Sequence, residues 1–347
     1  MQIEAIDLFC GVGGLTYGIQ KSGIKVVAGL DLDESCKYAF EINNNTKFIH
    51  KDIKNTEPEE LMNLYSENSI KLLMGCAPCQ PFSRHQKDKK NRNKHKDWGL
   101  LYEFVRLIKG INPEIVSMEN VPQLAREKVF KDFTKQLEEL GYKCNYSIID
   151  ASDYGVPQYR RRLLFLGYKE RKVEFIKKTH EFEKVSVREA LGKLPIIKAG
   201  EQDKKDLIHK AANLTKINLE RIRYSRPGGT WEEWPENLLP KCYKKKTGQT
   251  YTTVYGRLDP KKPANTITTQ FFSYGTGRHG HYEQDRALSL REGAILQGFP
   301  NDYIFVENNE KILNTVIGRQ IGNAVPPKLG EIIGESILKG LEGVKYG

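Results

Sequence analysis

The sequence has no run of about eighteen apolar residues, which excludes a transmembrane helix of ordinary length. It begins MQIEAIDLFCGVGG, where acidic residues stand in place of a basic cluster, so no secretory signal peptide is predicted. Cysteine is scarce, with six residues in 347, at positions 10, 36, 76, 79, 144 and 242. These are too few and too scattered for a disulfide framework, and we expect reduced thiols in a cytoplasmic protein.

Positive charge is abundant, with a net charge of +11. Residues 84–96 contain seven Lys or Arg against one Asp, and residues 241–262 contain seven more against Asp259. Basic segments of this kind are typical of proteins that bind a polyanion, most often nucleic acid. A solvated lysine-rich surface is the alternative, and charge alone does not decide between them.

Strand and helix patterns alternate in the first half of the chain. Short apolar runs predict strands at 3–9, 25–33, 47–52, 70–78, 114–120, 144–150 and 162–168. Amphipathic patterns between them predict helices at 15–23, 35–44, 59–67, 100–111 and 129–141. This alternation indicates an α/β fold with a doubly wound, mostly parallel sheet.

The composition and the periodicity of the sequence change after about residue 181. Residues 200–285 are polar, rich in Gly, Thr, Tyr and Lys, and show little helical period, so a second domain of short strands and loops is expected. A helix is predicted within 285–300, and another begins near Pro326 and Pro327.

The first predicted strand leads into a glycine-rich turn, DLFCGVGGL at 7–15. Its glycines lack the G-x-G-x-x-G spacing of a dinucleotide site. Asp31 ends the second strand, where a carboxylate can hold ribose hydroxyls, and Asp52 ends the third. These strand ends suggest an adenosine ligand, although the glycines taken alone are more typical of a tight strand-to-helix turn without a ligand.

Two cysteines lie three residues apart in GCAPCQPFS at 75–83. A redox pair is disfavoured because a basic loop, rather than an amphipathic helix, follows. A structural zinc site needs four ligands, and the sequence holds no second C-x-x-C or H-x₃-H. A nucleophilic cysteine is favoured, since Glu119 and the arginines of QYRRR (158–162) stand at later strand ends that converge on one sheet edge.

Six segments, in this order, resemble the motif set of the C5-cytosine DNA methyltransferases: DLFCGVGGL, GCAPCQPFS, ENV, QYRRR, RALSLREGAILQGFP and QIGNAVPP. Together they cover residues 3–328. The resemblance implies a Rossmann-like fold that uses S-adenosylmethionine, without a metal, to methylate cytosine at C5. It also implies a catalytic domain at 1–180 plus 315–347, a target-recognition domain at 181–285 and a connecting segment at 286–314.

The resemblance assigns the chemistry to four residues. Cys79 would add to cytosine C6, with Cys76 as a bystander. Glu119 would hold or protonate N3, which requires a protonated carboxyl in a desolvated pocket. Arg162 would contact the cytosine O2, and Arg160 would meet phosphate or another side chain.

The cofactor residues follow from the same motifs. They are Phe9, Gly11, Gly13, Gly14, Asp31, Leu32, Asp52, Ile53, Pro78, Leu100, Asn323 and Val325. Leu32 occupies a position that is often aromatic in relatives, so apolar contact is expected there in place of stacking. Cys10, often alanine elsewhere, is interpreted as core packing.

The duplex partner requires the target base to be flipped out. Gln80, Ser83 and Arg84 are predicted DNA contacts in a loop at 80–99, and Thr266 is a predicted phosphate contact. Arg226, Arg257 and Arg278 are candidate guanine readers, with a structural ion pair as the alternative for each. Trp231 and Trp234 are expected in the core of the recognition domain.

Two other functions compete with this interpretation. One is the tRNA-methylating branch of the same fold, whose Cys-Phe-Thr signature is absent from 181–285. The other is a catalytically silent DNA-binding protein, which the intact Cys79, Glu119 and Arg162 set disfavours. We expect a monomeric bacterial or phage enzyme, accompanied in the genome by a restriction endonuclease and without a membrane partner.

Overall fold

The computed structural model describes residues 2–78, 99–245, 248, 250, 252–307 and 311–342. The chain divides into two compact units. The first, here called the sheet unit, comprises Met1–Ala151, Arg161–Lys178 and Ala324–Gly347. The second unit comprises Ser152–Arg160 and Thr179–Asn323.

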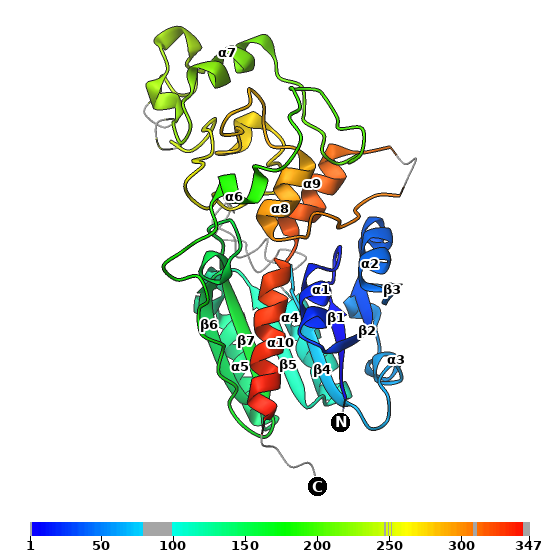
Figure 1. Ribbon diagram of the computed structural model, residues 1–347. Helices are drawn as coiled ribbons and strands as arrows, with labels where there is room; N and C mark the ends of the chain where they lie inside the picture. Colours follow the sequence, from blue (N-terminus) through cyan, green and yellow to red (C-terminus); the bar gives the residue numbers. More distant parts are fainter. Residues whose placement is uncertain are drawn as a thin grey trace. The chain divides into compact units, whose positions relative to one another are not determined.

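A seven-stranded sheet forms the centre of the sheet unit, in the order β3-β2-β1-β4-β5-β7-β6 (Figure 1). Its strands are β1 (Ile3–Leu8), β2 (Lys25–Asp31), β3 (Lys47–His50), β4 (Ile70–Gly75), β5 (Ile115–Asn120), β6 (Lys143–Asp150) and β7 (Arg161–Tyr168). Only β7 runs antiparallel to its neighbours, β5 and β6. The predicted doubly wound, mostly parallel sheet is therefore confirmed.

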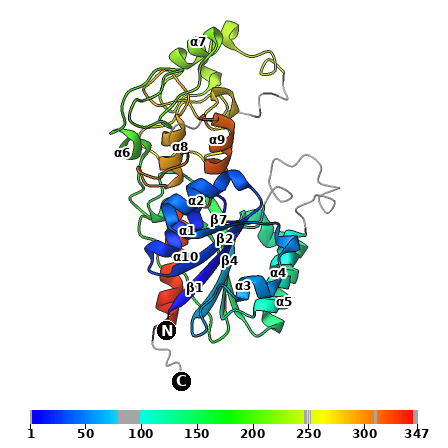
Figure 2. The same ribbon diagram turned by 90° about the vertical axis from the view of Figure 1, so that its right-hand side faces the viewer.

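Helices cover both faces of the sheet (Figure 2). One face carries α1 (Gly14–Lys21) and α10 (Pro327–Leu341), with α2 (Lys37–Asn44) against α1. The other carries α3 (Pro58–Met62), α4 (Leu100–Ile111) and α5 (Lys128–Glu139). In α4, Phe104, Ile108 and Ile111 lie on one stripe that is buried against the sheet. Burying each such side chain contributes about 1.5–3 kcal/mol, so packing fixes these helices more than propensity does.

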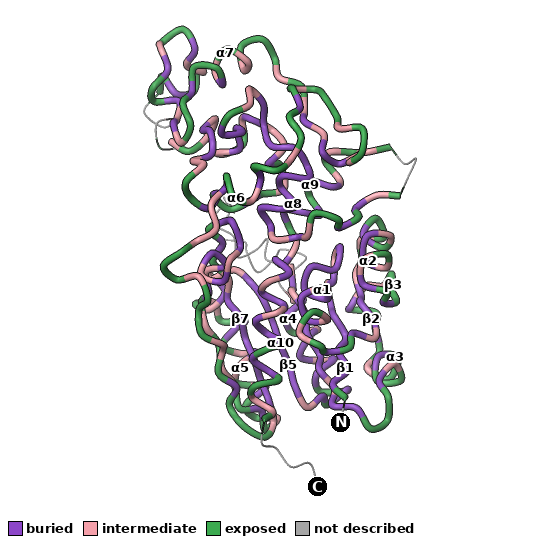
Figure 3. Tube along the Cα trace, in the orientation of Figure 1, coloured by how far each residue is buried: buried purple, intermediate pink, exposed green. Residues whose placement is uncertain are grey.

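Two glycines allow α1 and α10 to pack closely. A Cβ on Gly18 would lie 1.9 Å from the Pro327 carbonyl oxygen, and one on Gly330 would lie 2.5 Å from that of Leu15. Any side chain at these positions would push the helices apart. Figure 3 shows the result, a largely buried centre formed by β1, β4, β5 and the inner side of α10.

The second unit differs in part from the predicted domain of short strands and loops. It contains α6 (Val187–Leu191), α7 (Lys216–Tyr224), α8 (Leu290–Gln297) and α9 (Asn314–Asn323). Within the described part of 181–285 the pairing between backbones is limited to isolated bridges, such as Arg257↔Gly280. Residues 286–314, predicted as a connecting segment, and 315–323, predicted in the catalytic domain, belong to this compact unit. The functional division into catalytic and recognition domains stays a prediction.

Aromatic side chains form one core of the second unit. Trp231 stacks on Tyr243 with ring centroids 4.5 Å apart, and Trp234 donates its indole N–H to Ser225 Oγ at 2.8 Å. Both tryptophans are buried. The prediction that they are core residues is confirmed.

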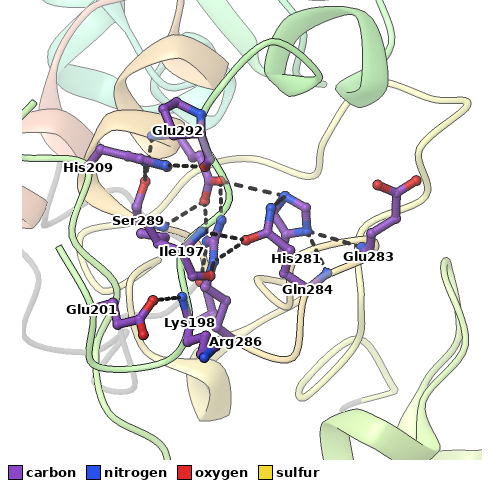
Figure 4. Close-up of polar contacts among 12 residues, drawn as sticks. Ile197, Lys198, Glu201, His209, His281, Glu283, Gln284, Arg286, Ser289 and Glu292 are labelled. Atoms are coloured by element: carbon purple, nitrogen blue, oxygen red, sulfur yellow. Dashed lines mark hydrogen bonds and ion pairs between the residues drawn. The ribbon is translucent and has the colours of Figure 1, made fainter. Parts of the chain in front are cut away.

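A charged network forms another part of this core (Figure 4). Arg286 donates from both terminal nitrogens to the two carboxylate oxygens of Glu292, at 2.7 Å each. Glu292 also accepts from Ser289 N, which caps α8. Burial alone would raise the pKa of Glu292, but the hydrogen bonds and charge of Arg286 outweigh it and lower the pKa to about 2.

Among the described helices, none combines the length and the apolar character needed to cross a bilayer.

Candidate active site

The glycine turn after β1 lies at the carboxyl ends of the parallel strands. Gly11 N donates to Asp31 Oδ2 at 2.8 Å, and Asp33 N donates to Asp31 Oδ1 at 2.8 Å. A Cβ on Gly11 would meet no atom of the described residues within 4 Å, so among these residues the turn opens onto free space beside this carboxylate. Gly13 caps α1 with φ of 89°, and Gly14 is the buried first residue of that helix.

Phe9 has φ of 59°, a left-handed backbone conformation that is a genuine outlier for a bulky residue. Strain of this kind persists where the surrounding structure enforces it, often at binding sites. Leu32, on the other side of the turn, leaves 63% of its surface exposed next to Asp31. The predicted cofactor residues around this turn therefore combine an apolar surface with a carboxylate.

Ile53 and Leu100 extend the site toward β3. Both are buried members of the same hydrophobic cluster, and Asp52 accepts from Lys54 N at the start of a short 3-10 turn. Arg106 fixes that turn by donating to the Ile53 carbonyl at 2.9 Å. The sheet unit therefore brings together Phe9, Asp31, Asp52, Ile53 and Leu100 at one end of β1, β2, β3 and α4.

Asp7, on β1, is a buried carboxyl near this turn that the sequence did not single out. Thr16 Oγ1 donates to Asp7 Oδ2 at 2.7 Å, whereas Oδ1 has no hydrogen-bond partner among the described residues. Burial, with a smaller contribution from the charge of Asp31, raises the pKa of Asp7 to about 7.

This raised pKa makes the stability of the protein depend on pH. Between the unfolded pKa of 3.8 and the folded value of about 7, the native state holds the extra proton, so stability falls as pH rises through this window. Relative to Asp7→Asn, the wild-type protein should lose on the order of 2–4 kcal/mol of unfolding free energy between about pH 4.5 and about pH 8. Urea unfolding of both proteins at the two pH values measures this difference, and a pH-independent difference would contradict it.

Glu119 lies at the end of β5 and is only 2% exposed. Arg162 Nε, on β7, lies 2.9 Å from Glu119 Oε1. Its N–H is not aligned on that oxygen, so the contact is an ion pair rather than a directed hydrogen bond. On the other oxygen, Cys76 Sγ donates to Glu119 Oε2 at 2.7 Å. The structure thus brings Glu119 and Arg162 together, as predicted, and adds Cys76, which the sequence had treated as a bystander.

Asn120 ties this site to the segment that precedes Cys79. Its side-chain Nδ2 donates to the Ala77 carbonyl at 2.9 Å, and its Oδ1 accepts from Val121 N. Asn120 is 1% exposed, so this bond is protected from water. The end of β5 therefore fixes the backbone that leads through Pro78.

Cys79, Gln80, Ser83 and Arg84 lie outside the described residues, as does most of the loop predicted at 80–99.

Two other cysteines, Cys10 and Cys144, have thiols that burial keeps protonated. Burial raises the pKa of Cys10 well above its usual range and that of Cys144 to about 12. Because the thiolate is the reactive form, neither residue is suited to nucleophilic attack. Cys10 is 7% exposed, in agreement with its predicted packing role.

Arg160 belongs to the second unit and is 3% exposed. It donates to the carbonyl oxygens of Ile267 and Gly322, each at 3.0 Å. Backbone carbonyls inside the unit therefore accept from both terminal nitrogens of this buried side chain, in place of the predicted phosphate or side-chain partner. Of the last two predicted cofactor residues, Val325 is a buried residue of the sheet unit and Asn323 is an exposed residue of the second unit.

Arg257 takes the structural alternative among the candidate guanine readers. Its Nε donates to the carbonyls of Ile222 and Ser225, and its Nη1 to those of His281 and Gln284. Its Nη2 pairs with Asp285. With 5% exposure and all three nitrogens engaged, this arginine has no donor face for a base edge. These bonds to backbone carbonyls connect segments of the second unit that are not joined by strand pairing.

Arg226 and Arg278 remain compatible with DNA contact. Arg226 is 77% exposed in its side chain and pairs with Glu233 at 2.9 Å. Arg278 Nη1 donates to Gly228 O at 2.6 Å, whereas its Nε has no partner among the described residues. The Gly228 carbonyl therefore holds Arg278 beside the turn that carries Arg226. Thr266 is exposed, and its hydroxyl donates to the Tyr159 carbonyl at 2.7 Å.

Sequence reasoning missed Cys76, Asn120 and Asp7 as site residues. The strand register would have revealed the first, because Gly75 pairs with Met118 and the next residues along both strands are Cys76 and Glu119. No sequence signal pointed to Asp7, whose environment depends on burial between α1 and β2.

Comparisons with known proteins agree with this geometry. Residues 3–339 match the family described as C-5 cytosine-specific DNA methylase. The chain is 49% identical over 343 residues to the type II methylase M.HgiDII of Herpetosiphon aurantiacus, covering 98% of this chain and 96% of that protein. It is 32% identical to the type II methyltransferase M1.HphI of Haemophilus parahaemolyticus, covering 98% and 87%.

Solved structures share the fold. A candidate DNA modification methyltransferase encoded within an E. coli prophage aligns with a TM-score of 0.73 and 24% identity, covering 97% of this chain and 99% of that one. The Dnmt2 methyltransferase of S. pombe aligns with a TM-score of 0.64 and 17% identity, covering 99% and 100%. At these identities the likeness concerns the fold.

Proposed function

Since the chain belongs to the C-5 cytosine-specific DNA methylase family and is thus a DNA cytosine-5-methyltransferase, we propose the way in which its residues carry out the reaction. In this proposal, Cys79 adds to C6 of a cytosine that has been flipped out of the duplex. The addition turns C5 into a nucleophilic enamine carbon. Once C5 has gained the methyl group, loss of the C5 proton and elimination of the Cys79 thiolate complete the cycle.

The observation that carries this proposal is the placement of Glu119. It is a buried carboxyl at the end of β5, with Arg162 on one oxygen and Cys76 on the other, and its neighbour Asn120 holds the backbone before Pro78. A carboxyl held there can protonate or hold N3 as charge develops on the ring. Arg162, which can only donate, is suited to the O2 carbonyl of the same base.

The residues around the glycine turn fit S-adenosylmethionine, which supplies an electrophilic methyl group when bound. Asp31 would hold the ribose hydroxyls, because its carboxylate lies beside the open space at Gly11. Leu32, Ile53 and Leu100 would provide apolar surface for the adenine, with Phe9 on its face and Asp52 at its amino group. Pro78 and Val325 stay predicted contacts, as does Asn323.

Labelled methyl transfer to duplex DNA tests the proposed nucleophile. Cys79→Ser should lose activity almost completely, whereas Cys144→Ala, with a suppressed thiol elsewhere in the sheet unit, should keep it. Duplexes that contain 5-fluorocytosine should trap a covalent adduct at Cys79. An adduct at Cys76, or labelling of tRNA in place of DNA, would overturn the proposal.

Binding of the cofactor gives a separate test. Asp31→Asn leaves one acceptor oxygen where the N–H groups of Gly11 and Asp33 now donate to two. The substitution should therefore weaken both the hydrogen bonds of the turn and the proposed contact with the ribose. We expect affinity for S-adenosylmethionine to fall about 10- to 100-fold, as for loss of a hydrogen bond to a charged group. Asp132→Asn, in the partly exposed ion pair with Lys128 on α5, is the control, and titration calorimetry measures both. Equal affinities would remove Asp31 from the site.

The second unit is proposed to recognise the target sequence. Arg226 and Arg278 are the candidate base readers, and Thr266 a phosphate contact, while Gln80, Ser83 and Arg84 are proposed to contact the flipped nucleotide. The type II relatives support a role in restriction-modification, in the cytoplasm and beside a separately encoded endonuclease. A monomer is proposed because the duplex itself is the large partner.

A further inference from the structure

We infer that Cys76 is a positioning residue for Glu119, and that its thiol allows this buried carboxyl to gain and lose a proton without losing its partner. The inference rests on the proposed role of Glu119. It gives the first cysteine of C-x-x-C a task of its own, distinct from that of the proposed nucleophile.

The strand register places the two residues together. β4 and β5 are parallel, with Gly75 opposite Met118, and the Cys76 N–H continues the β1–β4 pairing by donating to Leu8 O. The next residues, Cys76 just after β4 and Glu119 near the end of β5, therefore lie side by side. Sγ lies 2.7 Å from Oε2, within hydrogen-bond distance of the carboxyl oxygen.

The two oxygens of Glu119 have chemically different neighbours. A guanidinium has only donors, so Arg162 favours a lone pair on Oε1 and opposes a proton there. A thiol is both a weak donor and a weak acceptor. When Glu119 is ionised, Cys76 donates to Oε2; when Glu119 is protonated, the carboxyl O–H sits on Oε2 and Sγ accepts. Cys76 is thus the neighbour that tolerates both states.

Burial gives this contact its importance. At 2% exposure Glu119 has little access to water, and a buried polar atom that loses its partner is costly. A carboxyl that cycles between acid and carboxylate in such a place needs a neighbour that can switch its own role. Without such a neighbour, the Glu119 side chain would rotate toward the group that still pairs with it. It would then lose the orientation that contact with the base requires.

Three substitutions separate this role from simple packing. Cys76→Ser keeps a group that donates and accepts, and an oxygen suits the short distance to Oε2. Cys76→Val keeps the side-chain volume but removes the polar group, and Cys76→Ala removes both the volume and the polar group. We expect Val and Ala to lower kcat about 10- to 100-fold, the size of a positioning defect, with KM for DNA unchanged and Ser restoring most of the rate. Cys144→Ala should match the wild type.

If the Cys76→Val or Cys76→Ala variant transfers methyl groups at the wild-type rate, the inference fails while the proposed function stands. The same holds if the Cys76→Ser variant is as slow as Cys76→Ala. If the wild-type protein itself transfers no methyl group to DNA, the proposed function fails first. Thermal unfolding of each variant identifies a loss that comes from folding, and a kcat loss that tracks unfolding would also overturn the inference.

A measurement without turnover completes the test. The infrared S–H stretch of Cys76, isolated as the difference between wild type and Cys76→Ser, should lie at the low frequency of a hydrogen-bonded thiol. In a Glu119→Gln background the same difference band should move to higher frequency, because an amide is a weaker acceptor than a carboxylate. A band at the frequency of an unbonded thiol in both backgrounds would contradict the assignment.

Discussion

Glu119→Gln is expected to lower the rate of methyl transfer by about 10²- to 10⁴-fold, the usual contribution of a positioned general acid. Gln has the same shape, but its amide cannot give up a proton to N3. The change also replaces the carboxyl oxygen that lies 2.9 Å from Arg162 Nε, whose side chain is 15% exposed. Single-turnover transfer to cognate duplex DNA measures the effect on chemistry.

The matched control is Glu138→Gln, an exposed glutamate on α5. It should behave as wild type, and DNA affinity should be similar in all three proteins because the substitution acts on the reacting base. A Glu119→Gln enzyme with full single-turnover rate would show that the buried carboxyl is structural. Loss of DNA binding in parallel with rate would instead assign it to substrate binding.

Glu292→Gln is expected to destabilise the second unit by about 3–5 kcal/mol, the cost of leaving a buried partner charge uncompensated. Arg286 is 0% exposed, and its two terminal nitrogens both donate to this carboxylate. Trp231 and Trp234 are two of the chain's three tryptophans and are buried in this unit. Tryptophan fluorescence during urea unfolding should therefore follow its transition.

Glu283→Gln supplies the control for this prediction. Glu283 also pairs with an arginine, Arg188, but both side chains are more than half exposed, so the change should cost about 0–1 kcal/mol. The double replacement Arg286→Met with Glu292→Leu should recover part of the loss, since a buried pair can be exchanged for apolar packing. Equal unfolding midpoints for Glu292→Gln and Glu283→Gln would contradict the argument.

The sheet unit was largely predictable because its signals are local. Each predicted strand overlaps an observed one, and the amphipathic stripe at 100–111 coincides with α4. A buried parallel strand needs a continuous apolar run, and a helix on its face needs a period near 3.6 residues, so both patterns are written in consecutive residues.

The second unit was harder to predict, since its order depends on long-range polar bonds. Arg257 donates to four carbonyls in two separate segments, and Arg160 donates to two more carbonyls. An arginine that replaces strand pairing in this way looks in the sequence like one that reads a base. Helix α9 was also missed, because its polar sequence, NTVIGRQIGN, gives only a weak apolar stripe.

The sequence by itself determined the sheet and the family and predicted Glu119 and Asp31 as site residues, because these follow from apolar runs and from motifs in a fixed order. Tertiary structure alone decided which atoms meet. It set Cys76 against Glu119, buried Asp7 with a raised pKa, and enclosed Arg257. Register and burial join residues far apart in the chain, and the free energy of a charged or polar group depends on those neighbours rather than on the group itself.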